Sequence, residues 1–204
     1  MKPVRIVIFA KAPSPGQAKT RLIPALGAKG AAELATTMLR HTITEALAAK
    51  VGVVELCCTP ADDPLWLALD LPSSLSRTDQ GEGSLGERMA RASERVVAGG
   101  EPILLIGTDC PALDAAQLRE MALALTRVDA VITPAFDGGY VALGLNRFDA
   151  CLFQGIVWST DTVATATLER LAQLAWSLRQ FPPQRDIDEP DDLQALPANW
   201  TSRS

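Results

Sequence analysis

Short apolar runs alternate with amphipathic segments along the chain, and this pattern predicts the secondary structure. The apolar runs are typical of buried β-strands, whereas the segments between them carry apolar residues at helical spacing. We predict strands at 4–9, 51–58, 102–106, 130–133, 140–145 and 176–181. We predict helices at 31–49, 63–69, 84–97, 114–125 and 161–174. This alternation favours one α/β domain over residues 1–204, a three-layer α/β/α sandwich with a mostly parallel sheet.

Three loops of unusual composition each follow a predicted strand. Their sequences are FAKAPSPGQAKTRL (9–22), GTDCPAL (107–113) and TPAFDGGY (133–140). The carboxyl ends of parallel strands lie at one edge of a sheet, and ligands of α/β proteins bind outside that edge. The three loops therefore predict a binding site there.

The first loop is rich in positive charge. Prolines and a glycine shape its backbone, and Lys19 and Arg21 follow. An arginine can fork onto phosphate oxygens while a lysine acts as a point charge, so we expect phosphate binding, with a plain surface loop as the alternative. Neither the GxGxxG fingerprint nor a P-loop is present. The N-terminal cations are Lys2, Arg5, Lys11, Lys19, Arg21 and Lys29.

Acidic residues stand in the other two loops. Asp109 follows a buried strand, where a carboxylate suits a hard cation such as Mg²⁺. The alternative is a helix cap, although Asp114 is better placed for that purpose. Asp137 precedes Gly138 and Gly139, which would let the backbone approach a ligand closely. Asp-Gly is equally typical of a hairpin turn.

Two later segments carry weaker signals. The motif WST (158–160) precedes the helix predicted at 161–174, whose first amides would suit an anion, although ordinary capping explains the motif nearly as well. In the acidic segment 186–192, Ile187 stands between two aspartates, which indicates a strand end with one acid turned inward.

Composition excludes several classes of protein. The net charge of −5 argues against nucleic-acid binding, and no apolar run approaches the length of a membrane span. Four cysteines without a CxxC motif indicate reduced thiols in a cytoplasmic protein. The single histidine, His41, lies in a predicted helix, so we expect neither a Ser-His-Asp triad nor a nucleophilic pair with Cys110. No cluster of cysteine and histidine suggests zinc.

Five motifs, in order, resemble one known family. FAKAPSPGQAKTRL, QGEGSLGERM, GTDCPAL, DGGYVALGL and WST are similar to the bacterial glycosyltransferase-like family of the nucleotide-diphospho-sugar transferase superfamily, which includes members assigned to arsenosugar biosynthesis. The resemblance implies a Rossmann-like, glycosyltransferase A-type fold that binds a nucleotide diphosphate with Mg²⁺ or Mn²⁺. It implies that Asp109 binds the metal and that Lys19 and Arg21 hold phosphates. The other residues expected at the nucleotide are Ala10, Lys11, Pro15, Gly16, Thr108, Gly138 and Gly139.

The segment DIDEPDDL near the C-terminus resembles the tail of small-molecule nucleotidyltransferases, including guanylyltransferases that act on phospholactate. This likeness implies that Asp188, with Asp186 as second choice, also holds the metal. The chain departs from the two patterns at two points: the GGxSxRxG loop is missing, and Ser84 stands where we expect an aspartate. Ser84 still fits a helix cap, so we expect the fold to be unchanged.

We therefore expect a metal-dependent transferase that moves a sugar from a nucleotide diphosphate sugar to a small-molecule acceptor. Asp137, with Asp161 behind it, is the candidate general base. The alternative is a guanylyl- or cytidylyl-type nucleotidyltransferase that uses a nucleoside triphosphate and releases pyrophosphate. A non-catalytic nucleotide-binding module is a third hypothesis. Apolar residues near Trp158 and Trp176 would serve either a homodimer interface or the core.

Overall fold

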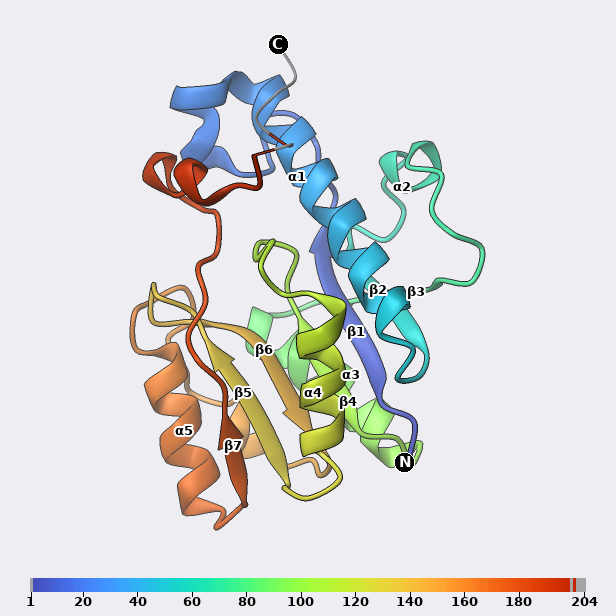
Figure 1. Ribbon diagram of the computed structural model, residues 1–204, viewed down its shortest axis with the longest axis vertical. Helices are drawn as coiled ribbons and strands as arrows, with labels where there is room; N and C mark the ends of the chain where they lie inside the picture. The colour runs from blue at the N-terminus through green and yellow to red at the C-terminus, as the bar shows by residue number, and fades with distance from the viewer. Residues whose placement is uncertain (1, 199, 201–204) are drawn as a thin grey trace.

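The computed structural model describes residues 2–198 and 200, and its centre is a seven-stranded sheet (Figure 1). The strand order is β3-β2-β1-β4-β6-β5-β7. The strands are β1 (Arg5–Lys11), β2 (Val54–Thr59), β3 (Ser76–Asp79), β4 (Ile103–Ile106), β5 (Ala130–Pro134), β6 (Tyr140–Leu145) and β7 (Leu178–Gln180). The α-helices are α1 (Ile23–Ala49), α2 (Leu65–Ala68), α3 (Leu85–Ala98), α4 (Ala115–Ala124) and α5 (Val163–Gln173). The 3₁₀ turns are η1 (Thr20–Leu22), η2 (Ala150–Leu152) and η3 (Pro190–Ala195).

Strand β6 runs against the direction of the rest of the sheet. It is antiparallel to both of its neighbours, β4 and β5, whereas the other pairings between neighbouring strands are parallel. The predicted mostly parallel α/β sheet is therefore confirmed. Because β5 leads into β6 through a hairpin, the turn between them lies at the same edge as the carboxyl ends of β1 and β4.

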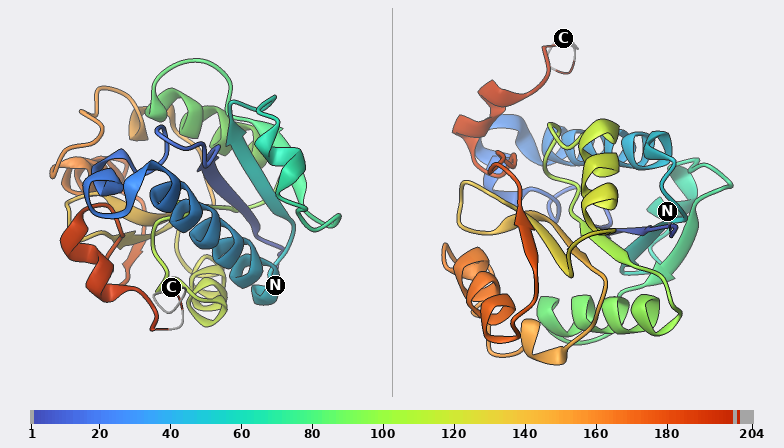
Figure 2. Two further views of the ribbon diagram at one scale, coloured as in Figure 1. Left: turned by 90° about the horizontal axis from the view of Figure 1, so that it is seen from above. Right: turned by 60° about the horizontal axis from the view of Figure 1, so that its bottom comes forward.

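Helices cover both faces of the sheet and bury its apolar side chains. Helices α1, α2 and α4 lie on one face and α3 and α5 on the other (Figure 2), and their side chains belong to two separate cores. Successive strand residues point to opposite faces, so that Cys58 belongs to the first core and Cys57 to the second. This arrangement is the predicted three-layer sandwich. In the described part of the chain, no helix is long and apolar enough to cross a membrane.

The sequence pattern missed or misplaced some elements. It did not predict β3, because its sequence, SRTD, is polar and the strand is at the edge of the sheet. The helix predicted at 31–49 extends back to Ile23, with an interruption at Gly27, where φ is 70°. The strand predicted at 51–58 begins at Val54, and the helix predicted at 161–174 begins at Val163.

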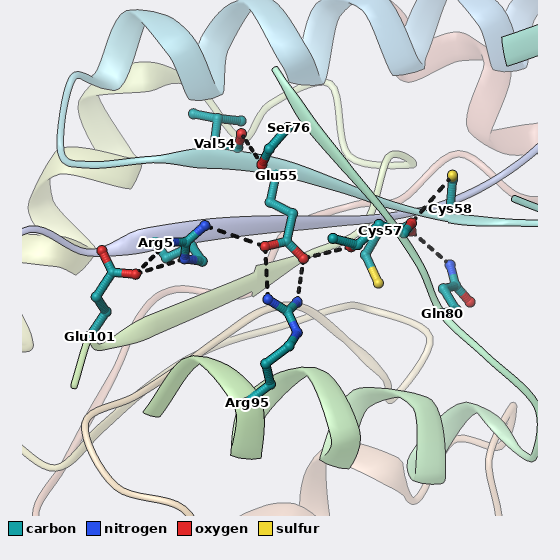
Figure 3. A network of polar contacts seen from close by, with 10 residues as sticks. Arg5, Val54, Glu55, Cys57, Cys58, Ser76, Gln80, Arg95 and Glu101 are labelled. Carbon is teal, nitrogen blue, oxygen red and sulfur yellow. Dashed lines mark hydrogen bonds and ion pairs between the residues drawn. The ribbon is translucent and has the colours of Figure 1, made fainter. Parts of the chain in front are cut away.

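Arg5 belongs to an ionic network around the buried Glu55 rather than to the basic loop (Figure 3). The carboxylate of Glu55 is 1% exposed and pairs with Arg5 (3.5 Å) and with Arg95 of α3 (3.2 Å). Thr78 donates a hydrogen bond of 2.7 Å to the same carboxylate, and Glu101 binds the other side of Arg5. A buried charge needs such partners, so this network stabilises the fold and removes Arg5 from the expected phosphate-binding cations.

Candidate functional site

A cleft of about 360 Å³ opens at the carboxyl edge of the sheet. Four aspartates from separate segments reach it: Asp109 after β4, Asp137 in the β5–β6 turn, and Asp186 and Asp188 after β7. The apolar and aromatic residues of the lining form an apolar wall. Its members are Phe9, Leu85, Met89, Leu105, Ile106, Tyr140, Val141, Trp158 and Val163. The three loops singled out from the sequence thus do meet at one edge.

A second, basic hollow of about 290 Å³ adjoins this acidic cleft. Lys11, Lys19 and Arg21 line it together with Thr108. The two spaces share Phe9, Gly107, Asp109 and Asp188, which are members of both linings. The site therefore has a cationic half and an anionic half that meet at two carboxylates.

Lys19 lies between those two carboxylates. Its Nζ is 3.0 Å from Oδ2 of Asp109 and 3.4 Å from Oδ1 of Asp188, and its side chain is only 7% exposed. The backbone at Lys19 has φ 47° and ψ 48°, a left-handed conformation that is uncommon for a lysine. Such a conformation is strained and persists only where the surrounding structure enforces it.

Arg21 reinforces one side of this arrangement. Its Nη1 is 2.7 Å from Oδ2 of Asp188 and 3.3 Å from Oε1 of Glu189, and its side chain is 60% exposed. Because it is exposed, the guanidinium can turn to another anion at little cost.

A backbone tether brings the C-terminal segment to the loop after β4. The amide of Ile187 donates a 2.8 Å hydrogen bond to the carbonyl of Asp109, and the Ile187 side chain is buried against α1 and η1. Asp192 of η3 accepts hydrogen bonds from the amides of Asp188 and Glu189. These contacts fix Asp188 beside Asp109.

Asp186 is half-buried where it lines the acidic cleft. Burial, reinforced by repulsion from Asp137, raises the pKa of the Asp186 carboxyl. The predicted strand end is not formed here: residues 186–188 are not a strand, Asp186 and Asp188 are both half-buried, and the side chain turned inward is that of Ile187.

The donor atoms at Asp109 and Asp188 suit a hard divalent cation. Carboxylate oxygens are the ligands that Mg²⁺ and Mn²⁺ prefer, and Mg²⁺ commonly uses one or two carboxylates plus substrate phosphates. In the described part of the chain, no group of three or more histidine, cysteine, aspartate or glutamate side chains is arranged to hold a metal. The residues fit a metal ion that is completed by phosphate oxygens, not a metal enclosed by protein alone.

The Asp137 turn is a hairpin that packs on the start of α5. Gly138 has φ 91°, and a Cβ at this position would overlap the backbone carbonyl of Asp161. The amide of Ala164 donates a 2.8 Å hydrogen bond to the carbonyl of Gly138, and Asp137 accepts one of 2.8 Å from the amide of Gly139. The hairpin alternative is therefore confirmed, and Gly138 serves the close approach of two backbones.

Some expected residues lie beside the two hollows rather than in them. Asp137 and Gly139 line the acidic cleft, whereas Asp161 and Gly138 are absent from its lining. Ala10 is buried in β1, and the basic hollow is lined by Lys11 and by 17–21, without Pro15 or Gly16. The side chains that we predicted for nucleotide binding and that do line the basic hollow are thus Lys11, Lys19, Arg21 and Thr108.

The remaining candidates have structural contacts. Ser84 and Glu87 form the capping box of α3, so the predicted cap is confirmed. The cap expected from Ser159 or Thr160 is not formed: α5 begins at Val163, and Thr160 donates to the carbonyl of Val157.

Cys110 is buried, donates a hydrogen bond to Gln184, and burial raises the pKa of its thiol to about 11. Cys110 therefore has no nucleophilic character at neutral pH. Trp176 belongs to the core.

Sequence reasoning missed the apolar wall. Tyr140 and Trp158 meet edge to face with ring centroids 6.5 Å apart, and Trp158 lines the acidic cleft with Leu85 and Met89. The available signal was aromatic side chains directly beside two of the recognised motifs, DGGY and WST.

Comparisons with known proteins agree with this fold. Residues 42–160 match a family described as an uncharacterized protein conserved in bacteria, DUF2064. A solved structure from Desulfovibrio desulfuricans G20, provisionally assigned as a nucleotide-diphospho-sugar transferase, is 30% identical, with a TM-score of 0.89 over 100% of this chain and 90% of its own. No curated protein matches the chain.

More distant structures share the fold. A cytidylyltransferase from Leptospira borgpetersenii serovar Hardjo-bovis is 17% identical, with a TM-score of 0.61 over 95% of this chain and 84% of its own. Rv0371c from Mycobacterium tuberculosis H37Rv, in a complex with manganese, is 16% identical, with a TM-score of 0.53 over 96% of this chain and 98% of its own. Sequence and structure together show that the chain belongs to the DUF2064 family, within the nucleotide-diphospho-sugar transferase superfamily.

Proposed function

We propose that the protein is a metal-dependent transferase that moves a sugar from a nucleotide diphosphate sugar to a small acceptor. The observation that carries the proposal is the junction of a basic hollow with an acidic cleft at Asp109 and Asp188. The 30% identity to a protein provisionally assigned as a nucleotide-diphospho-sugar transferase supports the reaction class. The manganese complex of Rv0371c supports a divalent cation in this fold.

The basic hollow would hold the diphosphate of the donor. Lys19 and Arg21 face it from the first loop, and Lys11 and Thr108 complete its polar lining. A bound Mg²⁺ or Mn²⁺ on Asp109 and Asp188 would neutralise charge on the diphosphate. Lys19 and Arg21 then stabilise the charge that develops on the departing nucleotide.

The acidic cleft would hold the acceptor. Its lining contains four aspartates and, among the described residues, no lysine, arginine or histidine. Such a lining favours an uncharged or cationic acceptor with an apolar part that packs on Trp158 and Met89. Asp137 would take the proton of an acceptor hydroxyl. The hydroxyl oxygen would then bond to the anomeric carbon of the sugar, while the bond from that carbon to the diphosphate breaks.

Nucleotidyl transfer is the alternative, because the fold is shared with a cytidylyltransferase. In that reaction an acceptor oxygen attacks the α-phosphorus of a nucleoside triphosphate, and pyrophosphate departs. The aspartates that line the cleft would repel a phosphorylated acceptor, so the acceptor of this alternative reaction would be a hydroxylated compound without a phosphate group. The two reactions differ in their leaving group, nucleoside diphosphate in one case and pyrophosphate in the other.

Thermal shifts would test donor binding. We would heat the protein with nucleotide sugars, nucleoside diphosphates and triphosphates, each with and without Mg²⁺ or Mn²⁺. A ligand at 100 times its Kd adds about 2.7 kcal/mol to the free energy of unfolding, which raises the Tm by several degrees. We expect the largest metal-dependent rise with one nucleotide sugar.

Two variants make this test specific. Asp109→Asn should lose the metal-dependent part of the rise, whereas Asp62→Asn, an exposed carboxylate outside both hollows, should keep it. A metal-dependent rise with triphosphates alone would favour nucleotidyl transfer, and no rise with any nucleotide would contradict the proposal.

A further inference from the structure

The ammonium group of Lys19 lies where the proposed metal ion would have to bind. It contacts one oxygen of Asp109 at 3.0 Å and one of Asp188 at 3.4 Å. Among the described residues, it is the cation that bridges these two carboxylates, since Arg21 contacts Asp188 and Glu189 and Lys11 contacts neither aspartate. A divalent cation contacts oxygen at about 2.0–2.6 Å, so it cannot share the space with this ammonium group.

Two features show that the fold holds Lys19 in this place. The side chain is 7% exposed although lysine is almost always found with its charge in water. The backbone at Lys19 is left-handed, a strained conformation for a side chain that lacks the local hydrogen bonds of asparagine or aspartate. Strain of this kind is maintained by the surrounding structure and concentrates at ligand clamps and switch regions.

In the free protein, the positive charge of Lys19 offsets the negative charges of Asp109 and Asp188. Asp109 follows β4 near the middle of the chain and Asp188 follows β7, and their charges would repel each other without a cation between them. Lys19 supplies that cation. It also lines the basic hollow, so a phosphate group that enters this hollow offers the ammonium a second anionic partner.

We propose that Lys19 is a built-in counter-ion of the metal site, so that a divalent cation binds tightly to Asp109 and Asp188 only together with a phosphate group. The inference rests on the proposed function, in which these two aspartates hold the metal. When donor phosphates arrive, Lys19 turns to them and the divalent cation takes its place. The free protein then binds metal weakly, and nucleotide and metal enter cooperatively.

The test is a titration of the nucleotide-free protein with Mn²⁺, in which free Mn²⁺ is followed by electron paramagnetic resonance. Lys19→Met keeps the length of the side chain and removes its charge. We expect this variant to bind Mn²⁺ about tenfold more tightly than the wild type, or more, because the competing ammonium and its repulsion are gone. Lys11→Met is the matched control, since it removes the same charge from the same hollow without contact to either aspartate. It should change the affinity much less.

A second variant guards against misfolding. Lys19→Gly accepts the left-handed backbone without strain and also removes the ammonium group, so it should show the same gain in Mn²⁺ affinity. Equal Mn²⁺ affinity in the wild type, Lys19→Met and Lys19→Gly would overturn the inference. An equal gain in Lys11→Met would also overturn it, because general charge would then explain the effect.

Adding Asp109→Asn to each protein separates this inference from the proposed function. Suppose that the wild type and Lys19→Met bind Mn²⁺ with equal affinity and that adding Asp109→Asn abolishes this binding in both. Asp109 is then a metal ligand as proposed, and the role given to Lys19 is wrong. If Mn²⁺ binding does not depend on Asp109 in any background, the proposed metal site itself fails, and the inference fails with it.

Discussion

Replacement of Gly138 by alanine should destabilise the protein strongly, because two separate costs combine at this position. Gly138 has φ 91°, and an alanine in the left-handed region costs about 1–2 kcal/mol. A Cβ at Gly138 would also overlap the backbone carbonyl of Asp161, which cannot move away as a flexible side chain can. Overpacking of this kind adds about 1–3 kcal/mol, so we expect a total loss of about 3 kcal/mol or more.

Gly100→Ala is the matched control for this prediction. Gly100 has φ 86°, close to the φ of Gly138, but no heavy atom lies within 4 Å of a Cβ built there. It should therefore show the conformational cost alone, about 1–2 kcal/mol. Urea unfolding measures both free energies, and the Tm should fall by about 2–4 °C for each kcal/mol.

The difference between the two variants isolates the contact between the Asp137 turn and α5. If Gly138→Ala loses no more stability than Gly100→Ala, the turn is not packed against Asp161 as described. The position assigned to Asp137 at the cleft would then lose its support.

Two further predictions concern the ionic network around Glu55 and a buried thiol. Glu55→Gln should lower the free energy of unfolding by about 2–4 kcal/mol, because it leaves Arg5 and Arg95 without their buried carboxylate. The control, Glu33→Gln, breaks an exposed pair with Lys29 and should cost less than about 0.5 kcal/mol. Equal losses of the two variants in urea unfolding would contradict the structural role of Glu55. Burial raises the pKa of the Cys58 thiol from 9.0 to about 11, so the stability that the protonated thiol contributes is fully present below pH 9 and is lost as the pH rises through about 11. Denaturation midpoints between pH 8 and 11 should therefore fall less in Cys58→Ala than in the wild type, and identical slopes would show that this thiol titrates normally.

Most of the sheet was predictable because its central strands are apolar on both faces. The run Ile103–Ile106 is apolar at every position, which predicts a buried strand, and all four residues are buried in the structure. The polar β3 gave no such signal, because an edge strand needs no apolar side chains to pair with its neighbour. The antiparallel direction of β6 was not predicted; it agrees with the hairpin alternative at the Asp-Gly turn, which we weighed evenly against a ligand-binding role.

The sequence singled out some of the residues that line the two hollows, but not the contacts between them. Asp109 and the basic loop stand out because each follows a buried strand. The ion pairs of Lys19 depend on the docking of a segment 169 residues away, which is held by the amide of Ile187 and its buried side chain. Sequence spacing contains no information about that docking, so a bridge between two proposed metal ligands required the structure.

The most direct test of the proposed reaction is to identify what leaves the donor. ³¹P NMR would follow nucleotide sugars and nucleoside triphosphates incubated with the protein and Mg²⁺, with water or added alcohols as acceptor. We predict metal-dependent release of nucleoside diphosphate from one nucleotide sugar, and loss of this release in Asp109→Asn. Release of pyrophosphate from a triphosphate, or full activity in Asp109→Asn, would contradict the account.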